Sequence, residues 1–161
     1  MITNGIDFYA RYRHEVSWGD IYGEVSGTYI LDLKQGGTTG VADVNGVDPN
    51  NKFKLYSTLG THVGKFQAQV AWLHNSGFAE TPTAVNLQQN HVSGFNLFNL
   101  FFQYKFQGSN PITKNLALTL GIDNVFDTDP PVYNGLSNSL FGVANGFTLG
   151  RVFKFGLSEK F

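Results

Sequence analysis

The chain has 161 residues, enough for one domain with a substantial core, and its charges nearly cancel, with 11 Lys and Arg against 12 Asp and Glu. No basic stripe of the kind that binds nucleic acid is present, and the absence of Cys excludes disulfides, thiolate metal sites and cysteine nucleophiles. Phe and Gly are abundant, with 15 and 19 residues, and no run of 18 apolar residues occurs, which excludes a transmembrane helix in this sequence.

The first four predicted elements are strands in which apolar and polar residues alternate with a period of two. They cover Ile6–Arg13, Asp20–Asp32, Lys52–Val63 and Lys65–Leu73. Their apolar faces carry, in chain order, Ile6, Phe8, Ala10 and Tyr12, then Ile21, Val25, Tyr29 and Leu31, then Phe53, Leu55, Leu59 and Val63, and finally Phe66, Ala68, Val70 and Trp72. The opposite faces carry charged and amide side chains such as Arg11, Glu24, Lys54 and Gln67.

Three further strands are predicted over Asn96–Phe106, Asn115–Asp123 and Phe147–Phe161. The first of them has aromatic or aliphatic residues on both faces, because Phe98, Leu100 and Phe102 alternate with Leu97 and Phe101. The sequence therefore does not decide which of its two faces joins the apolar side of the sheet. The second and third have clear apolar faces, formed by Leu116, Leu118, Leu120 and Ile122 and by Phe147, Leu149, Phe153, Phe155, Leu157 and Phe161. No segment has a 3.6-residue pattern, so no helix is expected.

Short and long connections alternate along the chain. The short turns are His14–Gly19, Val63–Gly64 and Gln107–Lys114, and the long loops, rich in Gly, Asn, Thr and Pro, are Leu33–Asn51, His74–Gly94 and Asn124–Gly146. This alternation is typical of an up-and-down outer-membrane barrel, which has short periplasmic turns and long external loops. Every short turn falls on the same side as the C-terminus, which is therefore expected in the periplasm.

A soluble β-sandwich or lipocalin-like barrel also has alternating strands. Its strands are usually about five or six residues long, and the segments predicted here are longer. Their polar faces carry Lys, Arg, Asp and Glu, which suit a water-filled lumen, whereas their apolar faces are dense in Phe and Leu. The sequence therefore favours an all-β fold, a segment of a transmembrane antiparallel up-and-down β-barrel with about seven strands.

The stretch Leu118–Asp127 ends in Asn124, Val125, Phe126 and Asp127 and is followed by the pair Pro130 and Pro131. It resembles the penultimate strand and last loop of TonB-dependent outer-membrane receptors, in which an Asn-(Leu/Val)-Phe-Asp motif precedes a Pro pair. The final strand, Gly150–Phe161, and the opening hairpin, Asn4–Tyr29, also resemble parts of those barrels. Physically, Asn124 and Asp127 can accept hydrogen bonds from backbone donors where the strand ends, and the Pro pair prevents further ladder pairing.

The C-terminus resembles the signal that the barrel-assembly machinery reads. Lys154, Gly156 and the terminal Phe161 fit that signal, whereas Glu159 stands where an aromatic or apolar residue is usual.

The resemblance implies the C-terminal portion, residues 1–161, of a receptor that has a plug domain and a barrel of about 22 strands. The plug itself is not part of this portion. The implied function is uptake of a scarce, bulky ligand such as an iron–siderophore complex. The implied partners are the outer-membrane lipid, the chain that carries the plug and remaining barrel, the barrel-assembly machinery, and an inner-membrane energy-transducing protein reached through the plug. The alternatives are a small passive porin or adhesin barrel and, third, a soluble lipid-binding barrel.

No catalytic, cofactor or metal site is predicted. The histidines His14, His62, His74 and His91 lack metal-ligand spacing, and Asp43–Asp48 matches a calcium loop only in part, because Gly46 is misplaced and no Glu follows at the twelfth position. Ligand contacts are expected in the long loops, where Tyr133 and Phe141 are the best candidates.

Overall fold

The computed structural model describes residues 1–37, 40–43, 46, 50–79, 91–106, 116–131 and 149–159. Within these ranges no helix is long and apolar enough to cross a membrane. The strands are β1 (Ile2–Val16), β2 (Gly19–Gly37), β3 (Gly40–Asp43), β4 (Phe53–Val63), β5 (Phe66–Asn75), β6 (Phe78–Ala79), β7 (His91–Val92), β8 (Phe95–Lys105), β9 (Leu116–Asp123) and β10 (Val152–Glu159).

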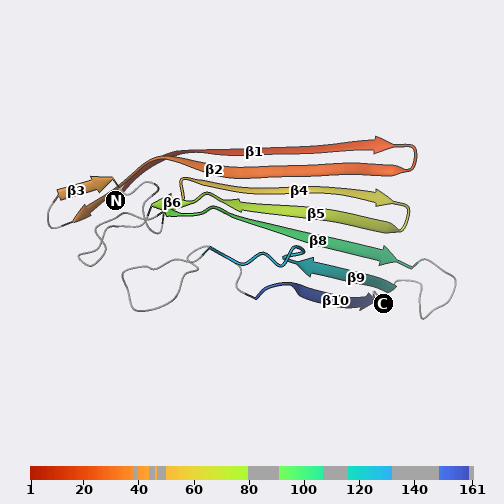
Figure 1. Ribbon diagram of the computed structural model, residues 1–161. Helices are drawn as coiled ribbons and strands as arrows, with labels where there is room; N and C mark the ends of the chain where they lie inside the picture. Colours follow the sequence, from red (N-terminus) through yellow and green to blue (C-terminus); the bar gives the residue numbers. More distant parts are fainter. Residues whose placement is uncertain are drawn as a thin grey trace.

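Seven of these strands form one antiparallel sheet in the order β1-β2-β4-β5-β8-β9-β10 (Figure 1). Each corresponds to one of the seven predicted segments, so the prediction of an all-β, up-and-down sheet is confirmed. β3 pairs with the end of β2, and β6 and β7 form a separate two-stranded ladder. Within the described residues β1 and β10 are the two edges and do not pair with each other, so the sheet is not closed.

Two of the short turns are two-residue connections; the first is tighter than the predicted His14–Gly19, and the second lies one residue after the predicted Val63–Gly64. Val16 pairs with Gly19, which leaves Ser17 and Trp18 as the whole connection between β1 and β2. Val63 pairs with Phe66, and Gly64 in that second turn has φ 57°. A left-handed residue matches a two-residue turn to the right-handed twist of the strands, which explains glycine at this position.

The long connections also contain regular structure that the sequence analysis assigned to loops. β2 continues beyond Asp32 to Gly37 and pairs with β3, and β6 and β7 pair within the predicted loop His74–Gly94. The predicted loops therefore begin too early. Each of these segments contains a buried apolar residue, Leu33, Phe78 or Val92, but the segments are too short to show a recognisable alternation.

The last strand begins later than predicted. Leu149, Gly150 and Arg151 lie outside β10. Gly150 has φ 68°, a left-handed conformation that does not fit a ladder, and the N–H of Arg151 bonds the Asp127 carboxylate instead of a neighbouring strand. Phe147 and Phe161, the predicted ends of this strand, lie outside the described residues.

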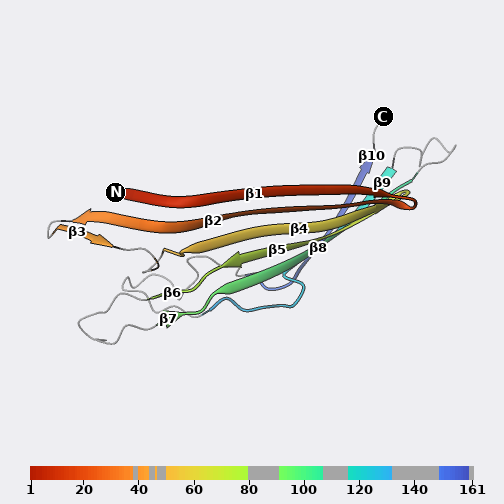
Figure 2. The same cartoon turned by 90° about the horizontal axis from the view of Figure 1, so that it is seen from above.

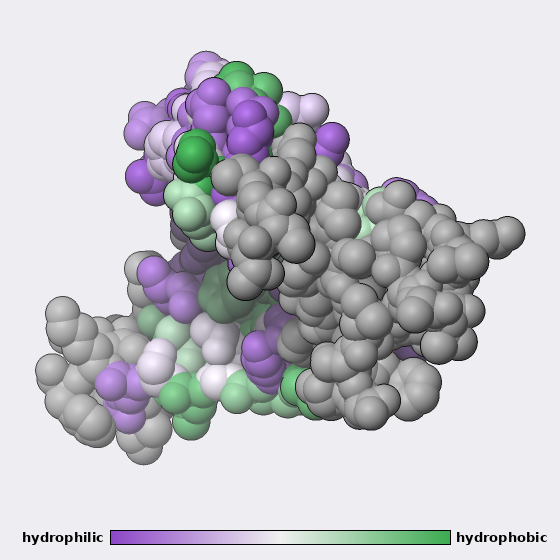
Figure 3. Space-filling view, turned by 90° about the vertical axis from the view of Figure 1, so that its left-hand side faces the viewer, coloured by the Kyte–Doolittle hydropathy of each residue, from purple (hydrophilic) through white to green (hydrophobic). Residues whose placement is uncertain are grey.

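The sheet is a single curved layer. Seen from above, β10 runs in a direction that crosses that of β1, so the sheet twists from one edge to the other (Figure 2). Viewed end-on, the molecule is hollowed on one side (Figure 3). Among the described residues, the buried apolar ones are Leu33, Ala71, Phe78, Val92, Phe95, Leu97 and Ala117. Many large apolar side chains are exposed, such as Phe155 at 82%.

Candidate functional site

The register of the sheet aligns apolar residues from all seven strands on one face. Residues that pair directly across antiparallel strands point to the same side. One such line of pairs crosses the whole sheet and contains only apolar residues and one glycine, namely Tyr12, Gly23, Leu59, Val70, Leu100, Ile122 and Phe153. We call the side that carries this line the apolar face.

The neighbouring line of pairs lies on the opposite side, which we call the polar face. It contains Arg13, Tyr22, Gly60, Gln69, Phe101, Gly121 and Lys154. Phe101 and Tyr22 are its large aromatic residues, and the Tyr22 hydroxyl is hydrogen-bonded. The facing of β8, left open by the sequence, follows from these pairs, since Phe98, Leu100 and Phe102 join the apolar face.

Aromatic rings form a continuous row across the loop end of the apolar face. Their ring centroids lie 6.3 Å apart for Phe8–Phe53 and Tyr29–Phe53, 5.7 Å for Phe53–His74, 6.0 Å for His74–Trp72 and Trp72–Phe98, and 5.4 Å for Phe98–Phe126. We call these seven residues the aromatic row. Sequence reasoning missed it, because its members lie on five strands and a loop, up to 118 positions apart (126 − 8).

Two polar groups in the aromatic row, on Trp72 and His74, share one partner. Trp72 Nε1 donates to Asn96 Oδ1 at 3.0 Å, and His74 Nδ1 lies 2.9 Å from the same oxygen. Side chains with an apolar ring and a hydrogen-bonding tip favour the boundary between water and an apolar phase. The row therefore has the composition expected at such a boundary, and it lies toward the loop end of the apolar face.

A hydrogen-bonded network occupies the turn end of the polar face. Asp20 accepts from Arg13 at 2.8 Å and lies 2.8 Å from His62 Nδ1. Beside it, Gln67 donates to the Tyr22 hydroxyl at 2.8 Å. That hydroxyl donates to Gln69 at 3.2 Å. Paired charges and satisfied hydroxyls of this kind suit a hydrated surface rather than a lipid-facing one.

The Asn-Val-Phe-Asp motif closes the end of β9. The Asn124 side chain, in a residue only 1% exposed, accepts from Thr128 N–H at 2.8 Å and donates to Thr128 C=O at 3.0 Å. The Asp127 carboxylate accepts from Arg151 N–H at 2.7 Å. Both side chains therefore bond backbone donors, as the sequence predicted, and Asp127 also ties the start of the loop to the start of β10.

The backbone of the motif is left-handed at two residues, and Phe126 and the Pro pair lie outside the strands. Asn124 and Asp127 have φ of 51° and 55°, values that Asn and Asp tolerate better than most residues. Phe126 is 69% exposed and packs edge-on against Phe98 in the aromatic row. Pro130 and Pro131 lie outside any strand.

The residues of the predicted assembly signal lie on the edge strand β10. Lys154 forms an ion pair with Asp123 of β9 on the polar face. Gly156 lies opposite Thr119, whose hydroxyl occupies the space that a side chain at Gly156 would need. Phe161 and the ligand-contact candidates Tyr133 and Phe141 lie outside the described residues.

In the part of the chain that the structure describes, no group of three His, Asp or Glu side chains is arranged to hold a metal ion. Most of the partial calcium loop Asp43–Asp48 lies outside that part. Comparisons with protein families, with curated proteins and with solved structures find no match to the chain.

Proposed function

We propose that this chain forms part of the wall of a bacterial outer-membrane β-barrel. The observation that carries the proposal is the register: an apolar line and a polar line, each crossing all seven strands, occupy opposite faces of one sheet layer. In a transmembrane barrel the outer face meets lipid and the inner face meets water, so one apolar and one polar face are needed.

The dimensions of the strands fit this role. β4 and β8 each have 11 residues. Such a strand is about 34 Å long, and at a tilt of about 40° it crosses about 26 Å, close to the height of the apolar band of an outer-membrane barrel. The aromatic row then lies where the outer interfacial girdle of such a barrel is expected.

The two open edges indicate a larger barrel. Five strands lie between β1 and β10, and each strand is antiparallel to its neighbours, so β1 and β10 both run from the loop end to the turn end. Lipid cannot satisfy the unpaired N–H and C=O groups of an edge, and antiparallel closure between two edges of the same direction requires an odd number of additional strands. We therefore propose that further strands, on the same or another chain, complete the barrel.

Within that class we propose the C-terminal part of a TonB-dependent receptor that takes up a scarce, bulky ligand such as an iron–siderophore complex. The support is the Asn-Val-Phe-Asp motif. Its Asn124 side chain bonds Thr128 at the start of the loop that follows β9, and its Asp127 side chain bonds Arg151 just before β10. The plug, the inner-membrane energy transducer and the barrel-assembly machinery are the partners of this proposal, and the C-terminus lies in the periplasm.

Uptake of radioactive iron, presented as ferric hydroxamate and ferric catecholate chelates, tests the function in iron-starved cells with and without the chain. We expect uptake of at least one chelate to need the chain and to stop when the proton-motive force is dissipated. Uptake that continues without the proton-motive force would instead indicate a passive porin. The mass of the assembled particle supplies the second criterion, with about 22 strands expected for the receptor.

A further inference from the structure

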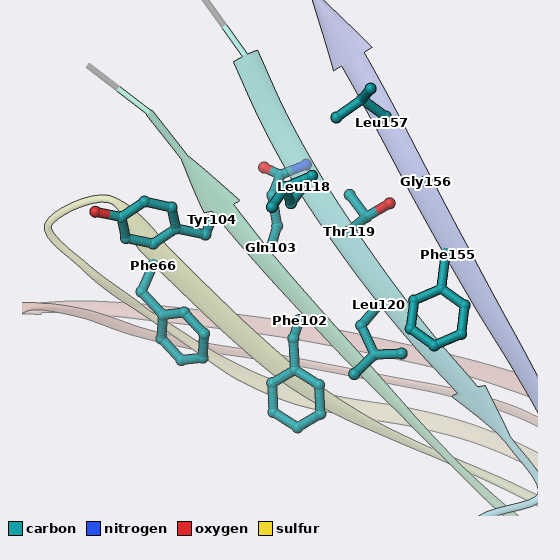
Figure 4. A pocket seen from close by; sticks show the side chains of 10 residues that line it. All are labelled: Phe66, Phe102, Gln103, Tyr104, Leu118, Thr119, Leu120, Phe155, Gly156 and Leu157. Carbon is teal, nitrogen blue, oxygen red and sulfur yellow. The ribbon is translucent and has the colours of Figure 1, made fainter. Parts of the chain in front are cut away.

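A groove of about 420 Å³ lies on the polar face, toward the loop end of β1, β2, β4 and β5. Its volume is within the range of sites that hold small molecules. Two neighbouring lines of paired residues contribute its side chains, namely Asp7, Thr28 and Lys54 in one line and Ser26, Tyr56 and Leu73 in the other. We call it the polar groove. A hollow on the apolar face differs in chemistry, because aromatic and aliphatic side chains such as Phe102, Leu120 and Phe155 line it (Figure 4).

The polar groove holds hydrogen-bonding groups that the described part of the chain leaves available. Thr28 Oγ1 donates to Asp7 Oδ1 at 2.6 Å, and both residues are exposed. Among the described residues, no ion pair or side-chain hydrogen bond engages Lys54, Ser26 or Tyr56. Three strands therefore bring a carboxylate, an ammonium group and three hydroxyl groups to one space.

The charge of the polar groove is balanced. Asp7 is the one acid that lines it and Lys54 the one base. The adjacent line of pairs repeats this balance, since it sets Arg11 opposite Glu24. A ligand of strong single charge would meet a like charge beside each opposite one, whereas a neutral ligand whose groups both donate and accept hydrogen bonds fits the whole set.

Aromatic surface lies beside these polar groups. The Tyr56 side chain is 40% exposed and neighbours the half-buried Leu73 across the β4–β5 ladder. Tyr9 is 61% exposed and lies on the other side of Ser26 in the same line of pairs, so the two tyrosines are about 10 Å apart. A sugar ring combines an apolar face that packs on an aromatic ring with a rim of hydroxyls that donate and accept. The separation of the tyrosines suits two linked rings.

We propose that the polar groove binds a neutral oligosaccharide. Tyr9 and Tyr56 pack against the faces of successive sugar rings, Asp7 accepts from their hydroxyls, and Lys54 donates to them. The inference rests on the proposed barrel wall, which puts the polar face in the lumen and the loop end at its outer mouth. It adds to the proposed function that the bulky ligand carries neutral sugar rings.

Calorimetry and saturation-transfer NMR test the site on the complete assembly, purified in a detergent that has no sugar headgroup. The probes are neutral trisaccharides of glucose, mannose, xylose and N-acetylglucosamine, with trigalacturonate as an anionic comparison and dialanine as a zwitterionic one. We expect at least one neutral trisaccharide to bind more tightly than either comparison. Tyr56→Ala and Asp7→Ala should each weaken that binding about tenfold. Tyr56→Phe, which keeps the ring, should retain most of it.

Tyr12→Ala is the matched control, because Tyr12 is an equally exposed tyrosine of β1 on the apolar face, and it should leave the affinity unchanged. Absence of binding by all four neutral sugars, tighter binding of trigalacturonate or dialanine, or an equal loss in Tyr12→Ala and Tyr56→Ala would overturn the sugar site. A barrel that assembles in the outer membrane and binds no sugar overturns this site alone. A chain that does not reach the outer membrane overturns the proposed function.

Discussion

Two adjacent residues of β9 provide a direct test of the lipid-facing side. Leu120 lies on the apolar face between Phe102 and Phe155, and Thr119 lies on the polar face between Gln103 and Gly156. We consider Leu120→Arg and Thr119→Arg in the complete barrel. The two substitutions share sequence context and strand position, so the face to which the arginine points is the main difference between them.

The expected magnitudes differ widely. An arginine on the lipid face near the midplane of a barrel costs about 2–4 kcal/mol, which lowers the ratio of folded to unfolded protein by about 30-fold to 700-fold. At position 119 the new side chain would enter the lumen. Gly156 has no side chain beside it, so the arginine can extend over that glycine, and we expect a cost below about 1 kcal/mol.

Urea titration gives the free energy of folding into phospholipid vesicles for both variants. The heat-induced shift of folded barrels on gels is a second measure of folding. Leu120→Ala serves as a control for lost packing, because it removes the leucine without adding charge. If Leu120→Arg folds as well as Thr119→Arg, the assignment of the apolar face to lipid is refuted. If both variants are equally damaged, both faces are buried and the sheet belongs to a soluble fold that has packed core on both sides of it.

Three further outcomes are expected. The chain alone should not give a stable monomer in detergent, because its two open edges leave ladder groups unpaired, and a heat-resistant monomer by gel filtration would contradict this. Epitope tags inserted within residues 80–90 should be accessible on intact cells, whereas a tag at Gly64 should not, and the reverse pattern would invert the topology. Asn124→Ala should lower the stability of the assembled barrel by about 2–4 kcal/mol, since it removes both hydrogen bonds to Thr128 and places alanine at a positive φ. Asn124→Gly should recover the backbone part of that loss, and urea denaturation of the two variants checks the difference.

The sequence predicted the seven long strands because alternation with a period of two reports a strand whose two faces meet different environments. It also predicted that Asn124 and Asp127 would accept backbone hydrogen bonds at the end of β9, because short polar side chains form such bonds locally. It did not predict the extension of β2 to Gly37, the ladder of β6 and β7, or the late start of β10 after Gly150. Pairing between short segments and a left-handed residue decided these, and neither produces an alternation long enough to recognise in the sequence.

The alternation within each strand, and with it the existence of one apolar and one polar side, is a property of the sequence alone. Which sides coincide is decided only by the register of the sheet, because a shift of one residue moves every side chain of a strand to the other face. The register aligned Tyr12 with Phe153 across five intervening strands, assigned Phe98 and Phe102 of β8 to the apolar face, and brought Phe8 and Phe126 into one aromatic row. These contacts join residues far apart along the chain, so no local pattern could specify them.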